Sequence, residues 1–205
     1  MTEAIAHLRP VSGRDDNAID LLAAERAAHE LLGALGVDLG GESLRDTPRR
    51  MARMYAELLT PAPFTPTTFP NEGGYDELVV ATKIPFHSLC EHHLLPFVGV
   101  AHVGYLPGDR IIGLSKLARV VEHFSRALQV QERLTTQIAG WLDDHLAPKG
   151  VGVVLEAEHM CMSMRGVQKP GARTVTSALR GSVRDDPRSR QELSLIHISE
   201  PTRRS

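Results

Sequence analysis

The chain has 205 residues and a formal net charge of −2, and 42% of its residues are hydrophobic. This length and composition are typical of one globular domain with room for a helical extension, and they exclude a collagen-like or wholly disordered chain. The near-neutral charge lacks the basic excess of a general nucleic-acid binder. Two cysteines cannot form a disulfide-rich scaffold, but with some of the ten histidines they suffice for one metal site.

Residues 1–16 are polar and are predicted to be a flexible N-terminus without the apolar core of a signal peptide. No stretch approaches the roughly 18 apolar residues of a transmembrane helix, so we expect a cytoplasmic protein with reduced thiols and no membrane partner. Residues 17–60 are predicted to be helical, with one helix over 17–35 and a second beginning at Thr47, which can cap it. Residues 61–76 are rich in proline and glycine and predict a linker.

A different pattern covers residues 77–181. Strands are predicted at four places and helices at two, in the order strand, strand, helix, helix, strand, strand, which favours antiparallel pairing and an α+β domain. The predicted strands are 77–84, 97–106, 151–162 and 173–180, and the predicted helices are 115–128, opened by Ser115, and 131–146. Residues 182–205 lose this periodicity and are predicted to be a C-terminal tail, of which 194–205, SLIHISEPTRRS, is expected to be non-native.

The strongest local signal is the motif Cys-Glu-His-His at residues 90–93. On a straight strand its cysteine and last histidine would point to opposite faces, so both reach one ion only if the chain turns there. The predicted break before Phe97 supplies such a turn. A second pair, His159 and Cys161, would share one face of the strand predicted there.

Thiolate and imidazole together suit zinc, and Cys90, His93 and Cys161 give three ligands. Three protein ligands leave a position for water, as in catalytic zinc sites. His92 and His159 are then close enough to serve acid–base chemistry. The alternative is a pair of core thiols with surface histidines, because buried free cysteines are common.

Candidate ligand contacts are spread along the chain. A helix start near residue 115 would offer free N–H groups to a phosphate, although each nearby cation could equally be a solvated surface charge. Gln131 and Glu132 stand at another helix start, where the carboxylate either compensates the helix dipole or accepts N–H bonds from an amide or guanidino edge. The candidates for the anion site are Ser115, Lys116, Arg119, Arg165, Arg50 and Arg53.

Three strings, SLCEHHLLPF, IIGLSKLARVVEHFSRALQVQERLT and EAEHMCMSMRGVQKPGARTVTS, resemble GTP cyclohydrolase I over roughly residues 17–193. The resemblance implies the tunnelling fold, an antiparallel four-stranded sheet with two helices on one side, preceded by an N-terminal helical extension. It implies hydrolysis of GTP to 7,8-dihydroneopterin triphosphate and formate, the first step of tetrahydrofolate or pterin biosynthesis. Zinc-activated water would attack the guanine imidazole carbon, and ring rearrangement would follow. It also implies a homodecamer of two pentameric rings with active sites at subunit interfaces.

The resemblance assigns roles residue by residue. Cys90, His93 and Cys161 match the Zn²⁺ ligands, and His92 and His159 match catalytic histidines. The substrate contacts match Ser115, Lys116, Arg119 and Arg165 at the ribose and triphosphate, Arg50 and Arg53 from a neighbouring subunit, and Gln131 and Glu132 at guanine. Two other functions stay open at this point: another tunnelling-fold enzyme acting on a pterin or deazapurine, and a structural zinc module with four closed ligands.

Overall fold

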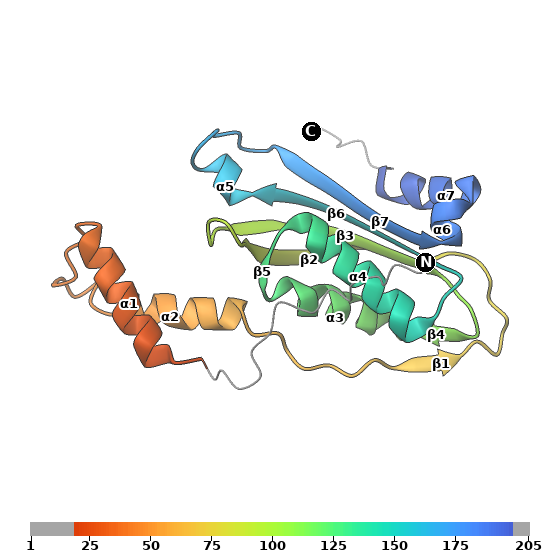
Figure 1. Cartoon of the computed structure of the whole chain (residues 1–205), viewed down its shortest axis with the longest axis horizontal. Coiled ribbons are helices and arrows are strands. Elements are labelled where there is room, and N and C mark those ends of the chain that lie inside the picture. The colour runs from red at the N-terminus through yellow and green to blue at the C-terminus, as the bar shows by residue number, and fades with distance from the viewer. Residues whose placement is uncertain (1–18, 199–205) are drawn as a thin grey trace, which may run out of the picture. The chain divides into compact units, whose positions relative to one another are not determined.

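The structure is a computed structural model that describes residues 19–198, with side chains up to Leu193. The predicted flexible segment 1–16 and the last part of the tail, 199–205, lie outside the described residues. The chain divides into two compact units, Met1–Thr60 and Pro61–Ser205, and the division falls where the proline-rich segment begins. Each unit is described by itself (Figure 1).

Over its described residues, 19–60, the first unit contains two helices, α1 (Leu21–Ala34) and α2 (Thr47–Leu58). Asp20 caps α1, since its Oδ1 accepts a hydrogen bond from the Ala23 N–H at 2.9 Å. Both helices were predicted, but Thr47 is the first residue of α2 and not its cap. The Thr47 hydroxyl instead accepts a hydrogen bond from the Arg50 guanidinium at 2.8 Å.

The second unit is built on one sheet with the strand order β5-β2-β3-β6-β7. Its four long strands are antiparallel: β2 (Val79–Cys90), β3 (Pro96–Leu106), β6 (Gly150–His159) and β7 (Arg173–Gly181). A two-residue strand, β5 (Leu128–Gln129), adds to β2 in parallel. A separate antiparallel pair joins β1 (Thr68–Pro70) to β4 (Arg110–Ile112). The predicted α+β class is confirmed, whereas the three short strands were not predicted because two or three residues show no periodicity.

Two helices, α3 (Leu114–Ser125) and α4 (Gln131–Leu146), cover one face of this sheet, as predicted (Figure 1). Apolar residues spaced three or four apart on each helix face the inward residues of the strands. Each fully buried large side chain there contributes about 1.5–3 kcal/mol. The centre of this core comprises Phe97, Val103, Leu117, Val121, Leu134, Ile138, Leu142 and Leu155.

The segment predicted as a tail contains two helices, α6 (Ser182–Asp185) and α7 (Pro187–Ile198). They pack on the sheet through a second, small core that comprises Val154, Val183 and Leu193. Gly104 and Gly152 are paired across β3 and β6, and a Cβ on either would contact the Leu193 side chain. The two glycines therefore leave room for Leu193, a contact that the weak periodicity of α7 could not indicate.

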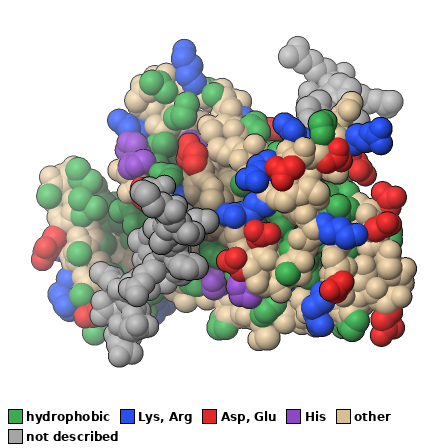
Figure 2. All heavy atoms as spheres, turned by 45° about the vertical axis from the view of Figure 1, so that its right-hand side comes forward, with side chains coloured by type: hydrophobic (Ala, Val, Ile, Leu, Met, Phe, Trp, Pro, Cys, Tyr) green, Lys and Arg blue, Asp and Glu red, His purple; other side chains and the backbone are tan. Residues whose placement is uncertain are grey.

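On the face shown in Figure 2, basic and acidic side chains are interspersed over the second unit, in keeping with the small net charge. Over residues 19–198, none of the helices combines the length and the apolar character that crossing a bilayer requires.

Candidate active site and metal centre

The motif at residues 90–93 forms a tight turn between β2 and β3. The strand β2 runs six residues beyond its predicted end, and Cys90 is its last residue. The Cys90 carbonyl then accepts hydrogen bonds from the N–H groups of His93 (3.3 Å) and Leu94 (2.9 Å). In such a helical turn residues three apart share a face, so the thiol of Cys90 and the imidazole of His93 point the same way. The turn that the motif required is therefore present.

Cys161 reaches the same place from β6, which ends at the same edge of the sheet as β2: Leu89 of β2 pairs with Pro96, and His159 of β6 pairs with the next residue, Phe97. The strand β6 ends at His159, and the chain turns into the four-residue helix α5 (Met160–Ser163). Cys161 thus lies in a helical turn, and the prediction that it shares a strand face with His159 is wrong. The strand was predicted over 151–162 (VGVVLEAEHMCM), and in the structure it ends three residues earlier, at His159.

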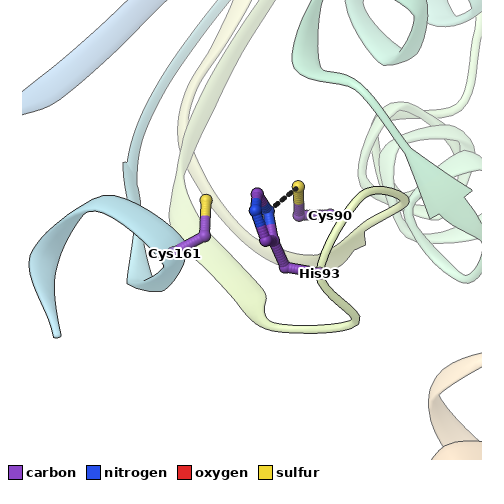
Figure 3. A group of neighbouring side chains, drawn as sticks. All are labelled: Cys90, His93 and Cys161. Atoms are coloured by element: carbon purple, nitrogen blue, oxygen red, sulfur yellow. Dashed lines mark hydrogen bonds between the residues drawn. The ribbon is translucent and has the colours of Figure 1, made fainter. Parts of the chain in front are cut away.

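The ligand atoms of Cys90, His93 and Cys161 all lie within 4.8 Å of one another. Figure 3 shows the imidazole of His93 between the two sulfurs, with the dashed contact of 3.7 Å between Cys90 Sγ and His93 Nδ1. For zinc with ordinary Zn–S and Zn–N bonds, two tetrahedral ligand atoms are about 3.6 Å apart. The donor types and their spacing therefore fit a metal ion.

The two thiols are close enough to affect each other. Burial raises the pKa of the Cys161 thiol above its ordinary value, and the neighbouring Cys90 raises it further. Both effects disfavour a thiolate without a cation, and a divalent cation would reverse them by stabilising both thiolates. Both cysteines are free thiols in the structure, as a metal site requires.

His92 lies beside this set of ligands and not within it. Its Nδ1 is 3.8 Å from Cys90 Sγ, yet the group that could hold an ion contains His93. The His92 side chain is 63% exposed, and its Nε2 is 3.7 Å from a carboxylate oxygen of Glu91. The other carboxylate oxygen of Glu91 pairs with Arg133. Glu91 was not recognised from the sequence, although its place inside the motif was a signal.

His159 is held by two neighbours. Its ring stacks on Phe97, with the ring centroids 4.6 Å apart and an angle of 4° between the planes. Its Nε2 lies 2.8 Å from Oε1 of Gln131, the first residue of α4. Burial lowers the pKa of His159 below its ordinary value of 6.5, and the nearby Glu132 carboxylate partly opposes this. The ring is therefore neutral near pH 7 and able to accept a proton.

Known proteins match this chain over most of its length. A family model described as GTP cyclohydrolase I matches residues 24–197. The chain belongs to the GTP cyclohydrolase I family. Among curated relatives, GTP cyclohydrolase 1 of Streptococcus agalactiae serotype V is 52% identical over 84% of this chain and 95% of its own. GTP cyclohydrolase 1 of Streptomyces avermitilis is 54% identical over 84% of this chain and 89% of its own.

A solved structure, the archaeosine synthase QueF-Like in the apo form, overlaps 51% of this chain and 93% of its own, at 16% identity and a TM-score of 0.41. That likeness is far weaker than the match to GTP cyclohydrolase I, and the family assignment rests on the latter alone.

In this GTP cyclohydrolase I chain the predicted substrate residues fall into separate groups. Gln131, Glu132 and His159 lie together, and Arg165 is near enough to Cys161 to lower its pKa slightly. Residues 115–119 form the first turns of α3, whose N-cap is Gly113, so Ser115 is not the cap. Of this stretch, Ser115 and Arg119 are exposed and Lys116 is half-buried. Arg50 and Arg53 are on α2 and belong to the first unit.

The loop that follows α5 in this family member is anchored by Glu158. Its Oε1 accepts hydrogen bonds from the Ser163 hydroxyl (2.6 Å) and the Gly171 N–H (3.0 Å), so one carboxylate ties both ends of the loop. These bonds, the Ser163 bond first, lower the pKa of Glu158 below its ordinary value of 4.5. The loop carries Arg165 and follows Cys161, so Glu158 supports both.

We expect this anchor to weaken in acid. A carboxyl group with a lowered folded-state pKa stabilises the fold fully above pH 4.5, its ordinary value, and loses that contribution as the pH falls through the lower value. Exchange of the Gly171 amide hydrogen should therefore accelerate below about pH 4.5 in the wild type, beyond the intrinsic pH dependence. In Glu158→Gln the amide should exchange fast already near neutral pH, without the added acid step. An identical pH dependence in both proteins would contradict the anchor.

Proposed function

We propose that this chain hydrolyses GTP to 7,8-dihydroneopterin triphosphate and formate, with zinc as its metal, in tetrahydrofolate or pterin biosynthesis. The observation that carries the proposal is the convergence of Cys90, His93 and Cys161 within 4.8 Å in a member of the GTP cyclohydrolase I family. Curated relatives about half identical to this chain bear the name GTP cyclohydrolase 1.

The three residues would hold zinc through two sulfurs and one imidazole nitrogen, which are ligands that zinc prefers. A bound zinc ion supplies an activated water for addition to the carbon between the imidazole nitrogens of guanine, because coordination lowers the pKa of water to about 7. Three protein ligands leave room for that water.

The residues around the metal would handle protons and the base. His92 is exposed beside the ligands, which suits a group that protonates the leaving ring nitrogen. His159 is the second proton-transfer group. Glu132 is exposed in the first turn of α4, and its carboxylate could accept two N–H bonds from the guanine edge, which would fix the base against the metal.

Cations would bind the triphosphate away from the reacting carbon and so supply binding energy that orients it. We assign this role to Lys116, Arg119 and Arg165, and to Arg50 and Arg53 of a neighbouring subunit. The neutral hydroxyl of Ser115 would add a hydrogen bond near the ribose and phosphates. Residues delivered from a neighbour require an oligomer, and we propose a homodecamer of two pentameric rings. The free thiols of both cysteines support a cytoplasmic location.

The test is formate release from GTP by purified protein, with and without a zinc chelator. We expect formate and, after oxidation, a fluorescent pterin, and we expect both to disappear with the chelator and return on adding zinc. No formate from zinc-loaded protein would reject the activity. Release that the chelator leaves unchanged would reject the metal role.

A further inference from the structure

The side chain of Gln131 is buried within the second unit, with 1% of the residue exposed. Its Nε2 donates to the carbonyl oxygens of Leu155 (3.1 Å) and Thr174 (2.9 Å) and lies 3.1 Å from the Thr176 hydroxyl. Leu155 belongs to β6, and Thr174 and Thr176 belong to β7. The amide therefore joins the start of α4 to two strands. A side chain engaged in this way has no free N–H to offer a ligand.

These partners decide which way the amide points. Carbonyl oxygens only accept hydrogen bonds, so the NH₂ group must face Leu155 and Thr174, and Oε1 must face His159. Oε1 is 2.8 Å from Nε2 of His159 and can only accept. The hydrogen of that bond therefore belongs to Nε2 of His159.

Two threonines complete the arrangement. The Thr135 hydroxyl donates to the backbone carbonyl of Gln131 at 2.7 Å, which uses its one hydrogen. The hydroxyl oxygens of Thr135 and Thr176 are 2.6 Å apart, so the Thr176 hydroxyl must donate its hydrogen to Thr135. The Thr176 oxygen can then accept a hydrogen bond from the Gln131 NH₂ group. Rotating the Gln131 amide by 180° would turn Oε1 toward the carbonyl oxygens of Leu155 and Thr174, which would set acceptors against acceptors.

The ring of His159 is constrained twice as a result. Stacking on Phe97, which is 0% exposed, sets the plane of the ring but leaves a 180° flip within that plane possible. The hydrogen bond from Nε2 to Gln131 removes this second freedom and selects the tautomer with Nε2 protonated. The nitrogen left with a lone pair is Nδ1.

We propose that Gln131 is a positioning residue that fixes the tautomer and orientation of His159, with Nε2 as the hydrogen-bond donor to Gln131 and the lone pair on Nδ1. This differs from the direct guanine contact that the family resemblance implies for Gln131, and it rests on the proposed function. The adjacent Glu132, whose side chain is exposed, keeps the guanine role. In this proposal the buried Gln131 orients His159, and the exposed Glu132 binds guanine.

The test compares variants of the zinc-loaded protein. Gln131→Met keeps the length of the side chain and removes its hydrogen bonds. We expect kcat to fall at least about tenfold, and by no more than the ~10²–10⁴-fold that a general acid or base contributes, while KM and the dissociation constant of GTP for metal-free protein stay within about twofold. Glu132→Ala should do the reverse and raise KM and the dissociation constant strongly. A raised KM with unchanged kcat in Gln131→Met would overturn the proposal in favour of a guanine contact.

Thr176→Val is the matched control for stability. It removes one partner of the Gln131 NH₂ group but leaves the two carbonyl oxygens and the bond to His159. Thr176→Val also removes the hydrogen bond between the Thr176 and Thr135 hydroxyls. We expect a lowered melting temperature with kcat within about threefold of the wild type, since each lost hydrogen bond costs about 1 kcal/mol. A kcat loss as large as that of Gln131→Met at a similar melting temperature would make the role of Gln131 merely structural.

A ¹⁵N NMR measurement of the His159 tautomer in the wild type tests the proposal even if Gln131→Met does not fold. In protein labelled with ¹⁵N-histidine, at a pH where the ring is neutral, the signal of His159 is identified by its loss in His159→Asn. We expect a protonated Nε2 and an unprotonated Nδ1, and the opposite tautomer would overturn the proposal. This reading needs no turnover, so it remains valid if the wild type releases no formate and the proposed function itself fails.

Discussion

Turnover should fall by about 10²–10⁴-fold in His92→Ala, while the zinc content stays near that of the wild type. The reason is that the two adjacent histidines of the turn after β2 have different roles. His93 lies within 4.8 Å of both sulfurs and completes the ligand set, whereas His92 is beside it with a 63% exposed side chain. Removing His92 therefore takes away a proton donor and leaves all three ligands in place. Formate release and zinc per subunit, measured by mass spectrometry, check this.

Two further variants frame the result. His93→Ala should lose zinc and activity together, because two sulfurs alone bind zinc weakly. His87→Ala is the matched control, since this histidine is exposed on β2 three residues before the motif and should leave zinc and turnover unchanged. If His92→Ala loses its zinc, the roles of the two adjacent histidines have been assigned the wrong way round.

Cys161→Ser is expected to lose zinc and essentially all turnover while the second unit stays folded. Serine is nearly the same size as cysteine but offers zinc a neutral hydroxyl in place of a thiolate. The main core between the sheet and helices α3 and α4 is built from fully buried apolar side chains, and Cys161 is only partly buried at its edge. Zinc content, formate release and far-ultraviolet circular dichroism check the three parts of this expectation.

The outcome separates an enzyme from a structural zinc module. If zinc held the domain together, Cys161→Ser would unfold it, and the circular dichroism spectrum would change with the loss of metal. Met162→Ser is the matched control, because Met162 is the exposed next residue of α5 and should keep zinc, fold and activity.

Much of the fold could be predicted because its elements are long and amphipathic. The helix predicted at 131–146 coincides with α4, and the four long strands lie where alternating or continuous apolar runs were found. The residues at which helices and strands end were less predictable. The strand β2 continues to Cys90 because its last residues pair with β3 and β5, and this pairing partner is not visible in the local sequence.

The C-terminal part shows the same limit. Residues 187–198 form a helix whose described contact with the sheet runs through Leu193, which lies over the paired Gly104 and Gly152. Over residues 187–193, where side chains are described, Leu193 alone is buried, and one buried residue produces no periodicity. The sequence therefore predicted a tail. The helix is stabilised on the sheet by a shape that only the folded strands create.

By itself, the sequence determined the chemistry available: two thiols and several imidazoles in motifs that resemble GTP cyclohydrolase I, which predict a metal site with Cys90, His93 and Cys161 as ligands. The tertiary structure decided how these groups are used. It turned His93 toward both sulfurs, left His92 exposed, and buried Gln131 against β6 and β7 with its oxygen facing His159. Side-chain direction depends on the turn after each strand and on partners far away in the chain, and neither is encoded in the spacing of the motif itself.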